Sequence, residues 1–167
     1  MEPGREAQAK EPAAERPSFR AIFEREYAYV SHTLRRLGAA ERDREDLTHD
    51  VFVAVYRGLP EYDPKRALRP WLFGIAFRVA SDYRRLARHR VETMSVAADA
   101  VDTAAPVDQR IAAHQAQQLV LAALDGLDLD RRALIVMHDI DGHTMPEIAE
   151  ALSIPLNTAY SLSLIHI

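Results

Sequence analysis

The sequence predicts an all-α protein made of two small helical domains joined by a flexible linker. Apolar residues recur every three or four positions in most of the chain, which is typical of amphipathic helices. No segment alternates polar and apolar residues over the length of a strand, so we expect no sheet. The periodicity fades over residues 93–107, which we interpret as the linker. It separates a first domain, residues 18–92, from a second, residues 108–167.

Composition excludes several classes of protein. The 167 residues include no cysteine, so disulfides, thiolate metal sites and cysteine nucleophiles are excluded. Residues 1–17 are rich in Pro, Ala and Glu, lack the apolar stretch of a signal peptide and predict a disordered tail. No apolar run has the length of a membrane span, so we expect no membrane insertion.

Charge differs between the two predicted domains. Residues 18–92 carry a formal charge of +4, whereas residues 93–167 carry −7. This asymmetry indicates two modules with different partners, although an uneven surface alone would give the same numbers.

Three helices are expected in the first domain. Ser18 is suited to cap the first, and Gly38 can close it in the left-handed conformation. The second helix is expected to begin near Asp43 as its N-cap and to end at Gly58. Pro70 is expected to start the third, whose buried stripe would comprise Leu72, Ile75, Ala76, Val79, Tyr83 and Leu86.

The second domain is expected to end in a helix-turn-helix. Helices resume near Asp108 and continue past Leu134. Thr144 and Glu147 have the spacing of a capping box, which predicts the start of a short helix. Residues 153–155 then predict a turn into one last helix.

The second helix carries polar residues on the face opposite its apolar side. The shared positions are Asp46, His49, Asp50, Val53 and Arg57. One interpretation is an ordinary solvated surface. The other is a docking surface for a basic partner helix, with Val53 as a small apolar anchor.

The third helix combines aromatic and basic residues. Between Arg78 and Arg90 there are five arginines and one acid, and Trp71 lies on the same face as Arg78 and Arg85. Arginines bind phosphates and aromatic rings stack on unpaired bases, so the pattern favours DNA that is single-stranded or being melted. The alternative is a core tryptophan followed by a basic helix end, which the helix dipole favours.

A metal site is the competing enzymatic hypothesis. His138, Asp139, Asp141 and His143 lie close together in the sequence, and His114 is the nearest further candidate. Because these residues fall at a helix end and a turn, without further ligands at suitable spacing, we expect no metal, no cofactor and no catalytic residue.

These segments, taken in order, resemble the extracytoplasmic-function (ECF) sigma factors of bacterial RNA polymerase. EDLTHDVFVAVYRGLPEYDP is similar to region 2.2, WLFGIAFRVASDYRRLARHR to regions 2.3 and 2.4, and LDLDRRALIVMHDIDGHTMPEIAEALSIPLNTAYS to the region 4 helix-turn-helix. The resemblance covers about residues 18–160 and implies a cytoplasmic initiation factor that is not an enzyme. The implied partners are core polymerase, promoter DNA and an anti-sigma factor.

The resemblance also implies roles for individual residues. The β′ clamp coiled coil would bind Asp46, Leu47, His49, Asp50 and Val53, and the β flap would bind region 4. Promoter DNA would contact the third helix at the −10 element and the helix-turn-helix at the −35 element. The candidate DNA-binding residues are Trp71, Arg78, Arg84, Arg85, Arg88, Pro155, Asn157, Thr158, Tyr160 and Ser161.

The sequence departs from the family pattern in four places. His49 stands where Gln is commoner, Arg78 where Asn is common, and Ser153 where Gly is frequent. In addition, no Lys or Arg follows Arg132, whereas the family continues with a basic recognition helix. We therefore expect an incomplete recognition helix, altered by truncation, and weak −35 recognition. A free-standing helix-turn-helix regulator and a His-Asp metal hydrolase are the rival hypotheses.

Overall fold

The computed structural model describes residues 15–93 and 109–164, and every regular element among them is helical, which confirms the all-α prediction. Most of the predicted tail and linker therefore lies outside the described residues. The elements are α1 (Phe19–Arg36), α2 (Glu41–Gly58), the 3₁₀ turn η1 (Leu59–Glu61), α3 (Leu68–Thr93), α4 (Gln109–Asp125), α5 (Leu129–Ile135), the π-helical turn η2 (Val136–Ile140), α6 (Met145–Leu152) and α7 (Leu156–Leu164).

Helix α1 begins and ends as the sequence predicts. The Ser18 hydroxyl accepts a hydrogen bond from the Ala21 amide and so satisfies one free donor of the first turn. At the other end Gly38 adopts φ +96°, and the Ala39 amide bonds back to the Leu34 carbonyl. This left-handed closure turns the chain sharply from α1 towards α2.

Helix α2 starts three residues earlier than an N-cap at Asp43 would place it. Its N-cap is Ala40, which offers no side-chain cap, so the prediction of Asp43 as N-cap is wrong. Asp43 lies in the first turn, and its carboxylate accepts a hydrogen bond from the Tyr83 hydroxyl at 2.8 Å. An acid at this place interacts favourably with the helix dipole, and its hydrogen bond to Tyr83 also connects α2 to α3.

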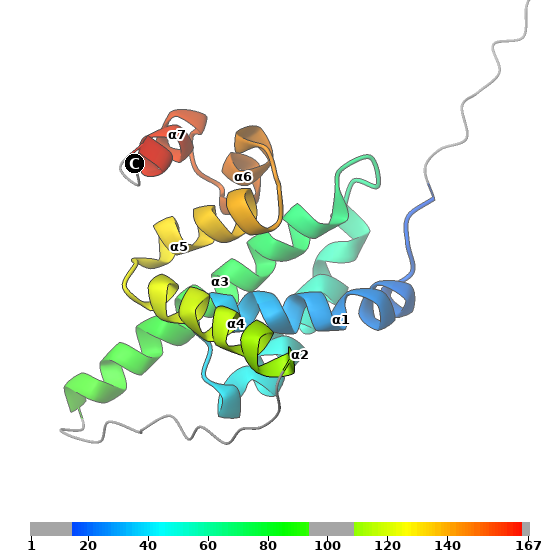
Figure 1. Cartoon of the computed structure of the whole chain (residues 1–167). Helices are drawn as coiled ribbons and strands as arrows, with labels where there is room; N and C mark the ends of the chain where they lie inside the picture. The colour runs from blue at the N-terminus through cyan, green and yellow to red at the C-terminus, as the bar shows by residue number, and fades with distance from the viewer. Residues whose placement is uncertain (1–14, 94–108, 165–167) are drawn as a thin grey trace, which may run out of the picture.

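Helix α3 is the long central element of the molecule (Figure 1). It begins at Leu68, so Pro70 falls within the first turn, where an amide has no helical partner in any case. Leu72, Phe73 and Ala76 are fully buried, as a core-facing stripe requires. The prediction fails at Leu86, which is 60 % exposed because α3 continues past the elements that cover it.

The helix-turn-helix forms as predicted. Thr144 and Glu147 make the reciprocal capping box at the start of α6. These bonds from Thr144 hold the pKa of the Glu147 carboxyl below its usual range. Ser153, at φ 56°, takes the left-handed position in which Gly would be unstrained, and α7 follows after Pro155.

The two halves pack against each other, a contact that the sequence does not predict. Helix α6 lies across α3 (Figure 1), and buried residues of both halves belong to one hydrophobic cluster. At the crossing, a Cβ on Gly74 would collide with the carbonyl oxygen of Ala151. Gly74 therefore permits a backbone approach that any larger residue would prevent.

Polar contacts reinforce this packing. The Arg132 guanidinium, 2 % exposed, donates to the carbonyl of Arg36 in α1 and pairs with Asp125 at 2.7 Å. Asp141 accepts a hydrogen bond from the Tyr29 hydroxyl at 2.9 Å and lies 3.4 Å from the Arg36 guanidinium. Burial and this carboxylate raise the pKa of Tyr29, so the hydroxyl keeps its proton.

We predict that Gly74→Ala destabilises the compact arrangement. In an ordinary helix interior, replacing Gly with Ala increases the free energy of unfolding by about 1 kcal/mol. Overpacking against Ala151 decreases it by roughly 1–3 kcal/mol. Small-angle scattering should show a larger radius of gyration, and thermal unfolding followed by circular dichroism should begin earlier. Gly126→Ala is the matched control, since its Cβ would meet only the Ala123 oxygen at 3.7 Å. A Gly74→Ala chain as compact and stable as the parent would contradict the close backbone contact between α3 and α6 at Gly74.

Candidate functional site

The polar face of α2 is open to solvent. Asp46, His49 and Asp50 are exposed, and Val53 is 48 % exposed. These four side chains therefore form a continuous surface over about two turns of α2, called the α2 face below. Their role in binding polymerase stays a prediction.

Leu47 does not belong to that surface. It is only 9 % exposed and joins Val51 and Val55 in the hydrophobic cluster. The helical period turns its side chain towards the core, and a role of Leu47 in binding polymerase stays a prediction. Leu47 holds the α2 face in place by packing beneath it.

Aromatic rings extend the α2 face in a way that the sequence analysis missed. Tyr56 is 65 % exposed, and its ring meets Phe19 edge-on at 5.3 Å between centroids. The Tyr27 ring stacks on Phe52 at 5.9 Å and lies 6.4 Å from the His49 ring. The four-residue spacing of Phe19, Phe23 and Tyr27 in α1 was the available signal, since such residues share one side of a helix.

The predicted DNA-binding arginines of α3 divide into two groups. Arg78, Arg85 and Arg88 are exposed, and Arg85 pairs with Asp82 at 3.0 Å. Such exposed ion pairs contribute little to stability, so the arginine can exchange its carboxylate partner for a phosphate.

Arg84 instead lies against the second half of the chain. One terminal nitrogen of its guanidinium is buried without a hydrogen-bond partner. Burial, followed by the positive charges of Arg132 and Arg88, lowers the pKa of Arg84. In this arrangement Arg84 is partly covered.

Trp71 takes part in packing on one side. Its ring lies 4.6 Å from that of Tyr62, which is buried and whose hydroxyl donates to the Arg66 carbonyl. Trp71 remains half-buried, so only part of the ring is available for stacking on a base. The loop below it continues to Arg66, which pairs with Glu150 of α6 at 2.6 Å.

The predicted recognition residues at the end of the chain are accessible. Pro155, Asn157, Thr158, Tyr160 and Ser161 are all exposed, and Tyr160 is 48 % exposed. The Ser161 hydroxyl donates to the Asn157 carbonyl of its own helix. Since Arg132 is buried, the last cation of the sequence is unavailable to DNA.

The residues considered for a metal site do not converge. His138 and Asp139 contact each other at 2.8 Å, whereas Asp141 points towards Tyr29 and Arg36. Within residues 15–93 and 109–164, no group of three or more potential ligands is found. The same part of the chain has no helix with the length and apolarity of a membrane span.

Two known protein families match this chain, one in each half. Sigma-70 region 2 matches residues 22–90, and sigma-70 region 4 matches residues 117–162. The sigma factor CnrH of Cupriavidus metallidurans is 28 % identical over 145 residues, which cover 82 % of this chain and 76 % of CnrH. The ECF sigma factor SigE of Mycolicibacterium smegmatis is 31 % identical over 149 residues, covering 87 % and 57 % of the two chains.

Solved structures agree with this comparison. The structure of CnrH in complex with the cytosolic domain of CnrY superimposes with a TM-score of 0.59 at 27 % identity, covering 86 % of this chain and 79 % of that one. RpoE of Bartonella quintana, in complex with the anti-sigma factor NepR, gives 0.62 at 18 % identity, with coverages of 86 % and 88 %, and supports the fold alone. With both sigma-70 regions present in order, the chain belongs to the ECF sigma factors of bacterial RNA polymerase.

Proposed function

We propose that this sigma factor directs promoter-specific transcription initiation with a division of labour between its helices. The α2 face binds core RNA polymerase, α3 captures the −10 element as it opens, and the helix-turn-helix approaches the −35 element. The observation that carries the proposal is the exposure of an acidic surface on α2 and an arginine-rich surface on α3 within one sigma region. We also propose residues 18–92 and 108–167 as the functional domains and the cytoplasm as their location.

The α2 face suits a basic partner helix. Asp46 and Asp50 lie one turn apart and supply carboxylates, while Val53 and Tyr56 supply apolar contact area within about two further turns. Charged rims set orientation and association rate, and buried aromatic groups contribute most of the affinity. The β′ clamp coiled coil is the proposed partner.

The exposed arginines of α3 suit an opening duplex. Arg78, Arg85 and Arg88 can pair with phosphates of a strand that lies along the helix. Phosphate contacts position the strand, and stacking of unpaired bases offsets the loss of base pairing. A partly exposed Trp71 supports stacking on its free side, although its packing on Tyr62 favours a positioning role.

Contacts to the −35 element are proposed to be weak in the described part of α7. Its exposed polar groups are amide, hydroxyl and phenol side chains, and none of them is a cation. Such groups can read base edges, but phosphate neutralisation supplies most of the affinity. Region 4 is proposed to bind the β flap. An anti-sigma factor is proposed as a regulator of this chain. In support, RpoE was solved in complex with the anti-sigma factor NepR, and CnrH was solved in complex with the cytosolic domain of CnrY.

We predict that Asp50→Arg weakens binding to core polymerase at least tenfold. Reversal of an exposed charge at a complementary surface adds repulsion without disturbing the core. Fluorescence anisotropy of labelled protein titrated with core polymerase, at two salt concentrations, measures the effect. Glu61→Arg, an exposed acid outside α2, is the control and should bind as the parent does. Equal affinity of Asp50→Arg and Glu61→Arg would exclude the α2 face.

We predict that Arg85→Ala weakens promoter opening by about 1–3 kcal/mol, while core binding is retained. Permanganate reactivity of unpaired thymines in the −10 region reports opening by the holoenzyme. The matched variant is Asp82→Ala, which removes the ion-pair partner of Arg85 and should leave opening equal or stronger. Parallel loss of core binding and opening in Arg85→Ala would point to misfolding and contradict a direct DNA contact.

A further inference from the structure

The α2 face contains a histidine, and we propose that the proton on His49 controls how tightly this surface binds core RNA polymerase. The neutral imidazole permits binding, whereas the imidazolium opposes it. This inference rests on the proposed function, because it concerns the same α2 face and the same basic partner helix. It makes His49 the residue that sets the affinity for polymerase according to pH.

His49 lies beside two carboxylates on an exposed helix surface. Asp46 comes three residues before it and Asp50 directly after it, and all three side chains are exposed. Residues three apart in a helix are neighbours on its surface. No hydrogen bond or ion pair joins His49 to another residue of the described part of the chain. The imidazole is therefore open both to protons from solvent and to an approaching partner.

The other side of His49 meets the aromatic rings that join α1 to α2. The Tyr27 ring lies 6.4 Å from the His49 ring and stacks on Phe52 at 5.9 Å. Phe52 is only 2 % exposed, so the hydrophobic core fixes the position of Tyr27. Tyr27 thus backs the imidazole from the α1 side and restricts its movement away from the two aspartates.

The remaining charged groups around His49 lie on its own helix or are engaged with other residues. Within α2, the exposed Glu45 lies about one turn before His49, and the exposed Arg57 lies about two turns after it. The charged residues of α1 on either side of Tyr27 are paired: Arg20 with Glu24, and Glu26 with Arg25 and Arg69. In the free chain, a proton on His49 therefore meets mainly carboxylates.

A proton on His49 changes the charge that the α2 face offers to a basic helix. The two aspartates give the face a formal charge of −2, and an imidazolium at His49 reduces it to −1. In the free chain the carboxylates stabilise the imidazolium, but in the complex they pair with cations of the partner, which also repel it. The complex therefore favours the neutral ring. Affinity is full where histidine is neutral and decreases as the pH falls through the range between about pH 8 and pH 5, in which histidine gains its proton.

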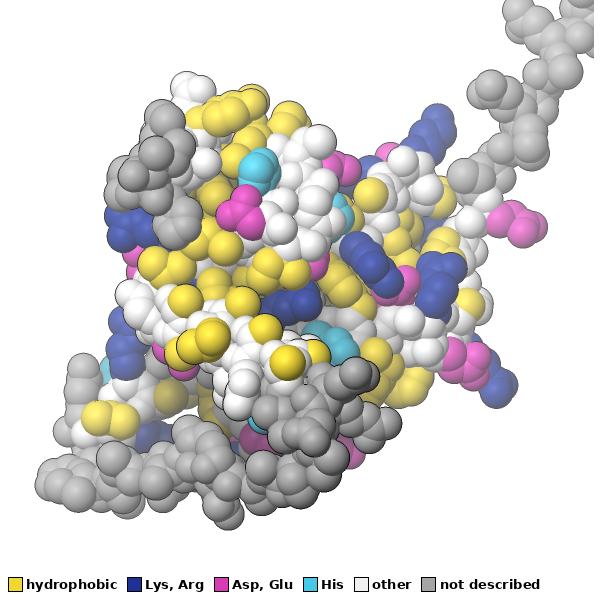
Figure 2. All heavy atoms as spheres, in the orientation of Figure 1, with side chains coloured by type: hydrophobic (Ala, Val, Ile, Leu, Met, Phe, Trp, Pro, Cys, Tyr) yellow, Lys and Arg dark blue, Asp and Glu magenta, His cyan; other side chains and the backbone are white. Residues whose placement is uncertain are grey.

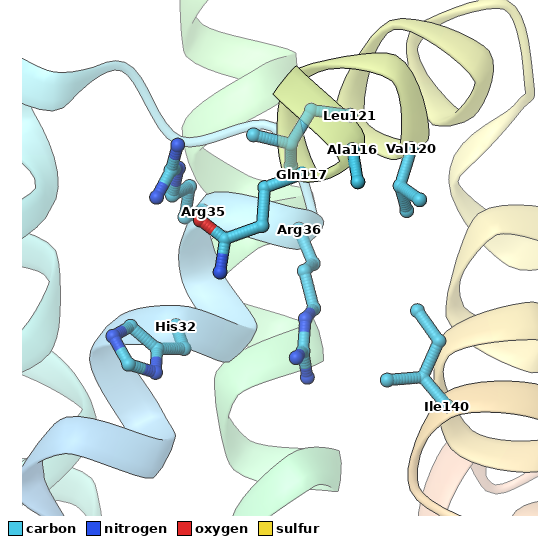
Figure 3. A pocket seen from close by; sticks show the side chains of 8 residues that line it. All are labelled: His32, Arg35, Arg36, Ala116, Gln117, Val120, Leu121 and Ile140. Atoms are coloured by element: carbon cyan, nitrogen blue, oxygen red, sulfur yellow. The ribbon is translucent and has the colours of Figure 1, made fainter. Parts of the chain in front are cut away.

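The effect has to be separated from that of other histidines, because the chain contains 7 of them. Figure 2 shows histidine side chains at separate places on the face in view. His32 lines a pocket between α1 and α4 (Figure 3), and His138 contacts Asp139 at 2.8 Å. The experiment therefore compares substitutions at His49 with a substitution of a histidine outside the α2 face.

The test is fluorescence anisotropy of the labelled full chain titrated with core polymerase, at constant ionic strength, between about pH 8 and about pH 5.5. The reference is His49→Gln, which stays neutral, so that titration of the polymerase itself affects parent and reference alike. The affinity of the parent relative to His49→Gln should decrease about fivefold to tenfold towards the acid end, as expected for one charge at a complementary surface. His49→Lys, which stays positive, should bind more weakly than His49→Gln by a constant factor throughout.

His138→Gln is the matched control, since it removes an exposed imidazole from the second half of the chain. It should keep the pH dependence of the parent, and circular dichroism should show that every variant is folded at each pH. A constant ratio between the affinities of the parent and His49→Gln would overturn the proposal. Equal affinities of His49→Lys and His49→Gln, or loss of the pH dependence in His138→Gln, would overturn it as well.

Asp50→Arg separates this inference from the proposed function. If Asp50→Arg binds core polymerase as the parent does at the alkaline end, the α2 face is not the docking surface, and both proposals are overturned. If Asp50→Arg weakens binding while the ratio between the parent and His49→Gln stays constant with pH, the docking surface stands and only the role of His49 is overturned.

Discussion

The buried guanidinium of Arg132 is the constraint on which the compact arrangement depends. An arginine at 2 % exposure is stable only if its charge and donors are satisfied, and Asp125 and the Arg36 carbonyl provide this. The carbonyl belongs to the end of α1, where Gly38 turns the chain and leaves room beside the guanidinium. The second half of the chain is thereby attached to the point where the first two helices meet.

This attachment determines which functional surfaces are accessible. It leaves the α2 face and the exposed part of α7 free, and it brings α6 across α3 at Gly74. The same packing covers part of Arg84 while Arg78, Arg85 and Arg88 stay exposed. Polymerase binding and promoter opening thus place different demands on the structure, because only the second involves a helix that the other half partly covers.

Local features of the fold could be predicted from the sequence, whereas contacts between distant segments could not. Ser18, Gly38 and the Thr144–Glu147 box were identified because each acts within one helical turn. Asp43 was misassigned as a cap because its partner, Tyr83, lies 40 residues away. Leu86 shows the same limit, since apolar character does not reveal where the covering elements end. The roles of the surface residues remain predictions, because the residues themselves do not show what they bind.

The central claim is that this chain acts on promoter DNA only together with core polymerase. The most direct test mixes promoter DNA with the chain alone, core polymerase alone or both, and follows opening of the −10 region by permanganate reactivity. The account predicts opening only when both proteins are present, since the α2 face and the arginines of α3 act in one complex. Specific, salt-resistant binding of duplex by the chain alone, with no opening when core polymerase is added, would contradict it and favour a free-standing regulator.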